Sequence, residues 1–367
     1  MGSVPKAALC APAGIWGRPP WAPPVTRLYL LRFGEMTLKS PPVRRLLERA
    51  LRRNLQQRLL QAHIEAVVRS DHGHLYLQVD ATGAAATERV VRTTFGITSF
   101  SPVVKVEATM DAIVQAGVDL AHEQLRPGQS FAVRPRRTGS HPFSSMEVGR
   151  IVGSAVFESL APQGGVRVDL HAPQWELSVE VRDHWAYLTS SREVGPGGMP
   201  YGTQGAILAV LHDTASAAAA WLLMRRGCTL RALLLPGGEN QVPVLRAWVP
   251  GFKTSRASST IEGQGWAGVL AEAAALAPKR GAKAIVCGLT FDQMGQTIPK
   301  GPLPVFFPLT GFDASRRARL IARVADPDLF LRQLDSGVAA GDDQPPRSGA
   351  ERAAEALAQG QAQASLI

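Results

Sequence analysis

With 367 residues and 45% hydrophobic side chains, the chain is too long for one ordinary core, and we expect two or three folded domains. The formal net charge of +10 favours polyanionic partners, either nucleic acid or an acidic membrane surface. Three scattered cysteines exclude a disulfide framework and favour the reducing cytoplasm. Prolines interrupt the N-terminal segment, which argues against a secretory signal, and no apolar run reaches the roughly 20 residues of a membrane span.

The first expected module is a small α+β unit over residues 26–80, after a proline-rich segment at 1–25 that is typical of a disordered tail. A strand at 27–33 and an alternating strand at 74–80 flank a helix at 43–61. Seven apolar side chains are expected on one face of that helix: Val43, Leu46, Leu47, Ala50, Leu51, Leu55 and Leu59. The other positions include five arginines: Arg44, Arg45, Arg49, Arg52 and Arg53.

A second α+β module is expected over residues 81–192. Its predicted helices lie at 87–94, 110–124 and 144–160, and its predicted strands at 102–108, 130–137, 176–182 and 185–190. A linker rich in glycine and proline at 193–200 precedes a third unit at 201–337. In that unit helices alternate with buried strands, which predicts a parallel α/β sheet with strands at 206–211, 229–235 and 284–288. Residues 338–367 are predicted to be a tail.

A basic cluster closes one strand of the second module. Arg134, Arg136 and Arg137 lie beside the turn at 138–145. Because a planar guanidinium group can bond two phosphate oxygens at once, this cluster predicts nucleic-acid binding. For the helix arginines at 44–53, the pattern leaves open whether they bind phosphate or only form a solvated surface.

Several segments, in order along the chain, resemble the tRNA 4-thiouridine synthetase family: RFGEMTLKS at 32–40, FGITSFSPV at 95–103, RPRRTGSHPFSSMEVGR at 134–150, VDLHAPQWELSVEVR at 168–182, GPGGMPYGTQG at 195–205 and AIVCGLTFDQMGQT at 284–297. The resemblance implies a ferredoxin-like N-terminal domain, a THUMP domain that binds tRNA, and a Rossmann-like PP-loop ATP pyrophosphatase domain. It makes tRNA the expected partner, with the basic cluster, the helix arginines and Lys39 as contacts. It also permits a link to thiamine thiazole synthesis.

The segment at 205–227 has the pattern of a strand, a loop and a helix, where that family keeps its phosphate-binding motif, S-G-G-x-D-S. Glycines serve there because only a bare backbone brings successive N–H groups against phosphate oxygens. The loop in this chain lacks them and carries His212, Asp213, Thr214, Ala215 and Ser216. The Asp213 carboxylate would repel a triphosphate. We therefore expect impaired or lost adenylation, with Asp213 or Thr214 serving only to cap the helix.

No catalytic residue is assigned. The family's sulfur-carrying cysteine aligns with Ser336, and a serine cannot hold a persulfide. Cys287 is the substitute candidate, although a lone cysteine in an apolar strand is usually a buried hydrophobe. His72 and His74 lack further ligands, so no metal site is predicted. ATP, magnesium and a sulfur-donor protein are expected only if the loop is functional.

Three functions stay open on this basis. The favoured one is a tRNA-binding protein that keeps the family fold and has lost adenylation. The second is an active sulfurtransferase that makes 4-thiouridine in tRNA, with Cys287 or a partner protein supplying the sulfur. The third is a scaffold that binds a paralogue or masks tRNA. The sequence does not predict an oligomeric state.

Overall fold

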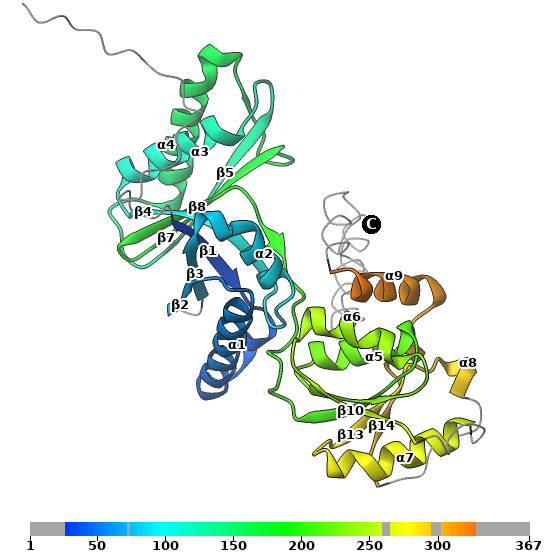
Figure 1. Ribbon diagram of the computed structural model, residues 1–367. Helices are drawn as coiled ribbons and strands as arrows, with labels where there is room; N and C mark the ends of the chain where they lie inside the picture. The colour runs from blue at the N-terminus through cyan, green and yellow to red at the C-terminus, as the bar shows by residue number, and fades with distance from the viewer. Residues whose placement is uncertain (1–25, 72–73, 259–264, 295–301, 328–367) are drawn as a thin grey trace, which may run out of the picture.

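The computed structural model describes residues 26–71, 74–258, 265–294 and 302–327. These residues form a nine-stranded sheet and a five-stranded sheet, each with helices packed on it (Figure 1). The predicted tails, at 1–25 and from 338 onward, lie outside the described residues. So do His72 and Ser336.

The nine-stranded sheet joins the first two predicted modules. Its strand order is β2 (Ala66–Asp71), β3 (His74–Asp80), β1 (Thr26–Arg32), β4 (Ser99–Glu107), β8 (Trp185–Thr189), β7 (Trp175–Arg182), β5 (Ser130–Thr138) and β6 (Arg167–Val168), with β9 (Glu193–Val194) also paired to β4. The first residues of β4 pair with β1 and its last residues pair with β8. The two modules therefore share one continuous sheet.

Four helices cover one face of this sheet: α1 (Pro41–Gln61), α2 (Ala84–Arg92), α3 (Met110–Gln124) and α4 (Ser145–Leu160). α1 and α2 pack on odd-numbered residues of β1 and β3, such as Tyr29 and Leu75. α3 and α4 pack on odd-numbered residues of β7, such as Leu177. Phe100 and Val106 of β4 join these two cores, which places both on the same side of the sheet. Among the described residues no helix covers the opposite side, and we call that side the open face.

The apolar face of α1 is narrower than predicted. Val43 and Leu46 are 45% and 54% exposed, which corrects the expectation that both lie in the core. The buried positions form one stripe against the sheet: Leu47, Ala50, Leu51, Leu55 and Leu59. The helix packs on the sheet only from Leu47 onward. The apolar residues that precede Leu47 on the same 3.6-residue period therefore face solvent.

The five-stranded sheet is parallel throughout, as predicted. Its order is β12 (Lys253–Arg256), β11 (Thr229–Leu234), β10 (Ala206–Leu211), β13 (Ala284–Val286) and β14 (Val305–Phe306). One face packs against α5 (Thr214–Arg225), α6 (Gln241–Trp248) and α9 (Ala314–Ala325), and the other against α7 (Gly265–Lys279), while α8 (Phe291–Met294) lies at one end (Figure 1). This is the predicted Rossmann-like α/β arrangement.

The segment between the two sheets is packed and hydrogen-bonded. Its residues from Gly195 to Pro200 are buried. Gly197 N donates to the carbonyl oxygen of Ile97 at 2.8 Å, and Arg225 Nε of α5 donates to the carbonyl oxygen of Pro196 at 2.7 Å. Gly198 has φ +75°, and a Cβ there would overlap the carbonyl oxygen of Arg225. Hydrogen bonds to residues of both domains therefore fix this segment in place.

Candidate functional site

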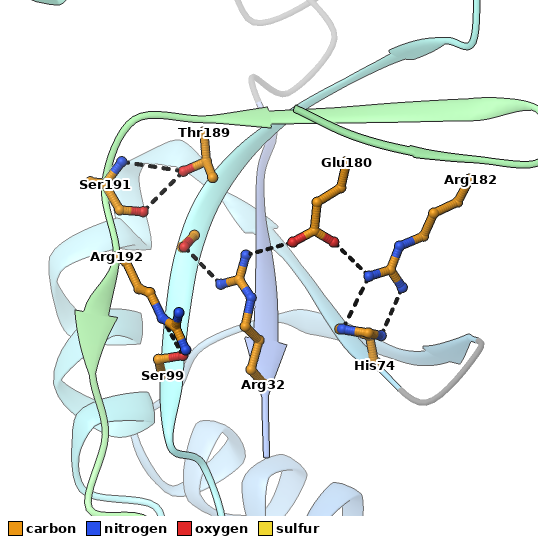
Figure 2. Close-up of polar contacts among 9 residues, drawn as sticks. Arg32, His74, Ser99, Glu180, Arg182, Thr189, Ser191 and Arg192 are labelled. Carbon is orange, nitrogen blue, oxygen red and sulfur yellow. Dashed lines mark hydrogen bonds and ion pairs between the residues drawn. The ribbon is translucent and has the colours of Figure 1, made fainter. Parts of the chain in front are cut away.

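The open face brings together charged side chains from strands that are far apart in the sequence (Figure 2). Arg32 of β1 donates to Glu180 Oε1 of β7 at 3.2 Å and to Ser101 Oγ at 2.9 Å. Arg182 donates to Glu180 Oε2 at 2.5 Å, and its guanidinium group also lies 2.7 and 3.1 Å from the two ring nitrogens of His74. One carboxylate therefore links the two halves of the sheet.

Two more arginines lie beside this network. Arg192 donates from Nε to Ser99 Oγ at 3.0 Å. Burial lowers the pKa of Arg192, and the positive charges of Arg32 and Arg136 lower it further. Arg136 of β5 is paired in register with Glu180 on β7, so both side chains stand on the open face. Two guanidinium groups thus contact the Glu180 carboxylate, and those of Arg136 and Arg192 lie on the same face of the sheet.

The Glu180 carboxylate is ionised at neutral pH. Burial raises its pKa, but Arg182 and Arg32 outweigh burial, and the net pKa lies below its ordinary value. The side chains of Glu180 and Arg32 are only 13% and 17% exposed. The ion pairs are therefore partly shielded from water and salt, and the face keeps an excess of positive charge.

The structure divides the predicted basic cluster of β5. Arg134 donates to Glu176 Oε2 at 3.2 Å and to the carbonyl oxygen of Leu170. Arg137 is directed to the following turn, 3.5 Å from the carbonyl oxygens of Gly139 and His141. Arg136 is exposed, and within the described part of the chain it has no hydrogen bond or ion pair. Of the three β5 arginines, Arg136 is therefore the one that lies next to Glu180 without a described hydrogen bond or ion pair of its own.

The predicted arginines of α1 form a separate surface, because α1 covers the side of the sheet opposite the open face. Arg45, Arg49 and Arg52 line a groove of about 260 Å³ with Glu48 and Ser70. The remaining candidates, Arg44, Arg53 and Lys39, lie on or just before the same helix, and Arg44 pairs with Glu48 at 3.6 Å. The sequence prediction grouped these residues with the β5 arginines, and the structure does not bring them together.

Arg32, Arg182 and Arg192 were not among the predicted contacts. Arg32 and Arg182 each end a strand and Arg192 lies just before another, and none is adjacent to a second basic residue, so none stands out as a basic cluster. Two of them do lie in segments that carry the family resemblance, RFGEMTLKS and VDLHAPQWELSVEVR. The even-numbered residues of β1 and β7 lie on one face of the sheet. Comparing those residues across the strands could have identified Arg32 and Arg182.

The loop after β10 is closed by its own side chains. Asp213 is the N-cap of α5, and its Oδ1 accepts from Ser216 N at 2.8 Å. Ser216 Oγ accepts from the backbone N–H groups of both His212 and Asp213, each at 3.0 Å. These amides are the donors that a phosphate would need at this helix N-terminus. The expectation that Asp213 or Thr214 caps the helix is met by Asp213.

Segments that follow the two neighbouring strands are in close contact with this loop. A Cβ on Gly288, after β13, would overlap the backbone of Ser216, and one on Gly238, after β11, would overlap the carbonyl oxygen of Leu211. The His212 ring packs edge-on against Trp266, with ring centroids 5.0 Å apart. Burial lowers the pKa of His212, although Asp213 opposes this, so the imidazole is neutral at pH 7. Among the described residues, the amides of this loop are thus already hydrogen-bonded, and its backbone is in close contact with Gly238 and Gly288.

Comparisons with known proteins identify the family. Residues 28–101 match the ThiI ferredoxin-like domain, and residues 107–191 match the THUMP domain. A protein named "Probable tRNA sulfurtransferase" from Methanosarcina acetivorans is 30% identical over 341 residues, which cover 83% of this chain and 82% of that protein. The chain belongs to the tRNA sulfurtransferase family. A protein of the same name from Aeropyrum pernix is 29% identical and covers 86% of this chain and 87% of its own.

Solved structures agree with this fold. The crystal structure of PH1313 from Pyrococcus horikoshii is 22% identical, has a TM-score of 0.67, and covers 82% of this chain and 100% of that one. The crystal structure of a 4-thiouridine synthetase–RNA complex with bound ATP is 21% identical, has a TM-score of 0.69, and covers 81% of this chain and 84% of that one. The predicted order of ferredoxin-like, THUMP and Rossmann-like units is thereby confirmed.

Neither described cysteine of this sulfurtransferase family member has the surroundings of a sulfur carrier. Cys287 follows β13 with no exposed surface, and burial raises its pKa to about 12. Cys228 is 8% exposed, and burial raises its pKa as well. A reactive cysteine needs the opposite, an accessible sulfur that ionises near neutral pH.

The described residues contain no group of three or more histidine, cysteine or acidic side chains that could hold a metal ion. His74, one of the two histidines considered above, is instead in contact with Arg182. None of the helices there is long and apolar enough to cross a membrane.

Proposed function

We propose that this member of the tRNA sulfurtransferase family binds tRNA through the open face and does not adenylate it. The observation that carries the binding proposal is the group of Arg32, Arg136, Arg182 and Arg192 on a sheet face that no described helix covers. Guanidinium groups spread over such a face suit the phosphates of a folded RNA, which proteins recognise mainly by shape and backbone. The name of the family and the RNA in the complex of the similar 4-thiouridine synthetase support this partner.

The loss of adenylation rests on the β10–α5 loop. ATP does not fit the residues present, because Ser216 Oγ already takes the amide donors of His212 and Asp213. A phosphate would have to break these bonds and approach an Asp213 side chain that is 46% exposed. We derive no reaction step through ATP or magnesium for this chain.

The arginine assignment makes a graded prediction for RNA binding. Arg136→Ala should weaken tRNA binding and lower the salt dependence by about 0.9 in the slope of log K against log[salt], the value for one phosphate on a duplex. Arg137→Ala, which removes the same charge one residue away, should have a smaller effect because Arg137 is directed to its own turn. Replacing Arg134, Arg136 and Arg137 together should weaken binding most. Titrations of the full chain with bulk tRNA at several salt concentrations measure all four proteins.

The result that contradicts this assignment is equally clear. If the triple alanine variant binds tRNA as tightly as the unaltered protein at every salt concentration, the β5 arginines are not contacts. Arg280→Ala serves as the charge control, since it removes one positive charge directly after α7, which packs on the other sheet. A loss of affinity there equal to that of Arg136→Ala would indicate a general effect of net charge.

The family name favours one other candidate, an active sulfurtransferase in which the unusual loop still binds ATP. Calorimetric titration with magnesium ATP separates the two. We expect no saturable heat up to millimolar nucleotide, and we expect that loss of this gene leaves the 4-thiouridine content of bulk tRNA unchanged. Thiouridine that disappears with the gene, and returns with the intact copy but not with Asp213→Ala, would establish the active enzyme.

A further inference from the structure

Glu180 carries a negative charge on the surface assigned to RNA binding, where positive charge is expected. Its two carboxylate oxygens accept from two arginines, Oε1 from Arg32 at 3.2 Å and Oε2 from Arg182 at 2.5 Å. Glu180 is thus the only carboxylate of the network in Figure 2, and it occupies the middle of that network. A fixed negative charge at the centre of a basic face lowers its attraction for a polyanion.

The arrangement of donors around Glu180 is what a phosphodiester requires. A phosphodiester group has two non-bridging oxygens that share one negative charge, as a carboxylate does, and each can accept from a separate guanidinium group. Arg32 reaches the site from the ferredoxin-like half of the sheet and Arg182 from the THUMP half. Arg136 and Arg192 lie next to it on the same face.

The Glu176 carboxylate, on the same strand, differs from Glu180 in its number of arginine partners and in its exposure. Glu176 lies on the same strand and the same face, four residues before Glu180. Among the described residues it pairs with Arg134 alone, at 3.2 Å, and its side chain is 50% exposed, against 13% for Glu180. An exposed pair of that kind contributes little and yields readily to solvent. The Glu180 pairs hold two arginines from separate strands in a shielded position.

We propose that Glu180 occupies, in the RNA-free protein, the position of one RNA backbone phosphate, and that RNA binding replaces the carboxylate with that phosphate. This inference rests on the proposed function. Displacing Glu180 breaks two ion pairs, so only a polyanion whose phosphate reaches Arg32 and Arg182 together recovers what is lost. Glu180 therefore selects for a ligand of the correct shape, because it weakens binding of every other polyanion.

The test compares Glu180→Gln with Glu176→Gln in the full chain, using unmodified tRNA and heparin as probes. Glutamine keeps the size of the side chain and one acceptor oxygen, so thermal unfolding should change little, and this is measured first. We expect Glu180→Gln to bind tRNA roughly five- to tenfold more tightly at 0.1 M salt, because the phosphate no longer has to displace a carboxylate from Arg32 and Arg182. Glu176→Gln should change the affinity by much less. Heparin should gain more than tRNA, which lowers the preference for tRNA.

An unchanged or weaker affinity of Glu180→Gln for tRNA would overturn the inference, since Glu180 would then position the arginines and not imitate a phosphate. An equal gain in Glu176→Gln would overturn it as well, because the effect would be one of net charge. In both cases the unaltered protein still binds tRNA and the proposed function stands. If the unaltered protein does not bind tRNA at any salt concentration, the proposed function itself fails and this inference with it.

As a final check on the site, Arg32→Ala in the Glu180→Gln background should cancel the gain in affinity. The expected result is a tRNA affinity no higher than that of the unaltered protein. A gain that persists without Arg32 would place the phosphate elsewhere and overturn the assignment.

Discussion

Replacing Phe95 by alanine should lower the free energy of unfolding of the C-terminal α/β domain by about 3–5 kcal/mol, the usual cost of deleting a buried phenylalanine ring. Phe95 follows α2 in the sequence, yet its ring belongs to the core of the other domain and is 2% exposed. It stacks on Trp248, with centroids 5.7 Å apart and an interplanar angle of 20°, and meets Trp221 edge-on at 5.7 Å.

The same replacement should loosen the junction between the two sheets. Arg58 of α1 donates to the carbonyl oxygens of Ala247 and Trp248, where α6 ends. Burial lowers the pKa of Arg58 to about 10, so it stays charged at neutral pH and suits the negative end of the helix dipole. Phe95 and Arg58 thus hold α6 from the ferredoxin-like side.

Urea unfolding followed by tryptophan fluorescence measures this effect, since Trp221 and Trp248 flank the Phe95 ring. Phe157→Ala on α4 is the matched control, because that ring is 46% exposed and should cost less than about 0.5 kcal/mol. If Phe95→Ala unfolds at the same urea concentration as the control, the packed junction described here does not exist in solution.

The second large effect concerns the chemistry of Cys287. With a pKa near 12, its thiolate fraction at neutral pH is about a thousandfold below that of an ordinary thiol, because each pKa unit is a factor of ten. Alkylation of Cys287 by iodoacetamide in the folded protein should therefore be slower than that of a free thiol by at least this factor. In guanidinium chloride the difference should disappear. Mass spectrometry of the peptide that contains Cys287 measures both rates.

Cys228 provides the internal comparison, since it is 8% exposed where Cys287 is fully buried. We expect Cys228 to react faster than Cys287 in the folded state. Modification of Cys287 at the rate of an ordinary thiol in the native protein would restore it as a candidate sulfur carrier. It would also weaken the case against an active sulfurtransferase.

The helix cap at Asp213 was predictable because it depends on neighbours in the sequence. Whether a backbone amide is accessible to phosphate follows from the side chains of the same few residues, and Asp213 and Ser216 are three apart. Their reciprocal hydrogen bonds form a local capping arrangement. The role of Gly238 and Gly288 was not predictable, since each contacts the loop from a segment that follows a different strand.

The arginine site was only partly predictable. Arg136 stands out in the run RPRR, and a run of like charge is visible without a structure. Arg32, Arg182 and Arg192 come from three separate segments, and Glu180 joins two of them. Nothing in any one segment indicates that its neighbours in space are basic.

The sequence by itself determined the family, the order of the three units, the parallel α/β sheet and the glycine-free loop. Those features rest on local periodicity and on the identity of adjacent residues, which the chain carries in one dimension. Only the tertiary structure decided that β4 joins two modules into one sheet, that the α1 arginines lie opposite the open face, and that Glu180 bridges Arg32 and Arg182. Strand pairing brings residues as far apart as Arg32 and Glu180 into contact, and no periodicity within either strand specifies that partner.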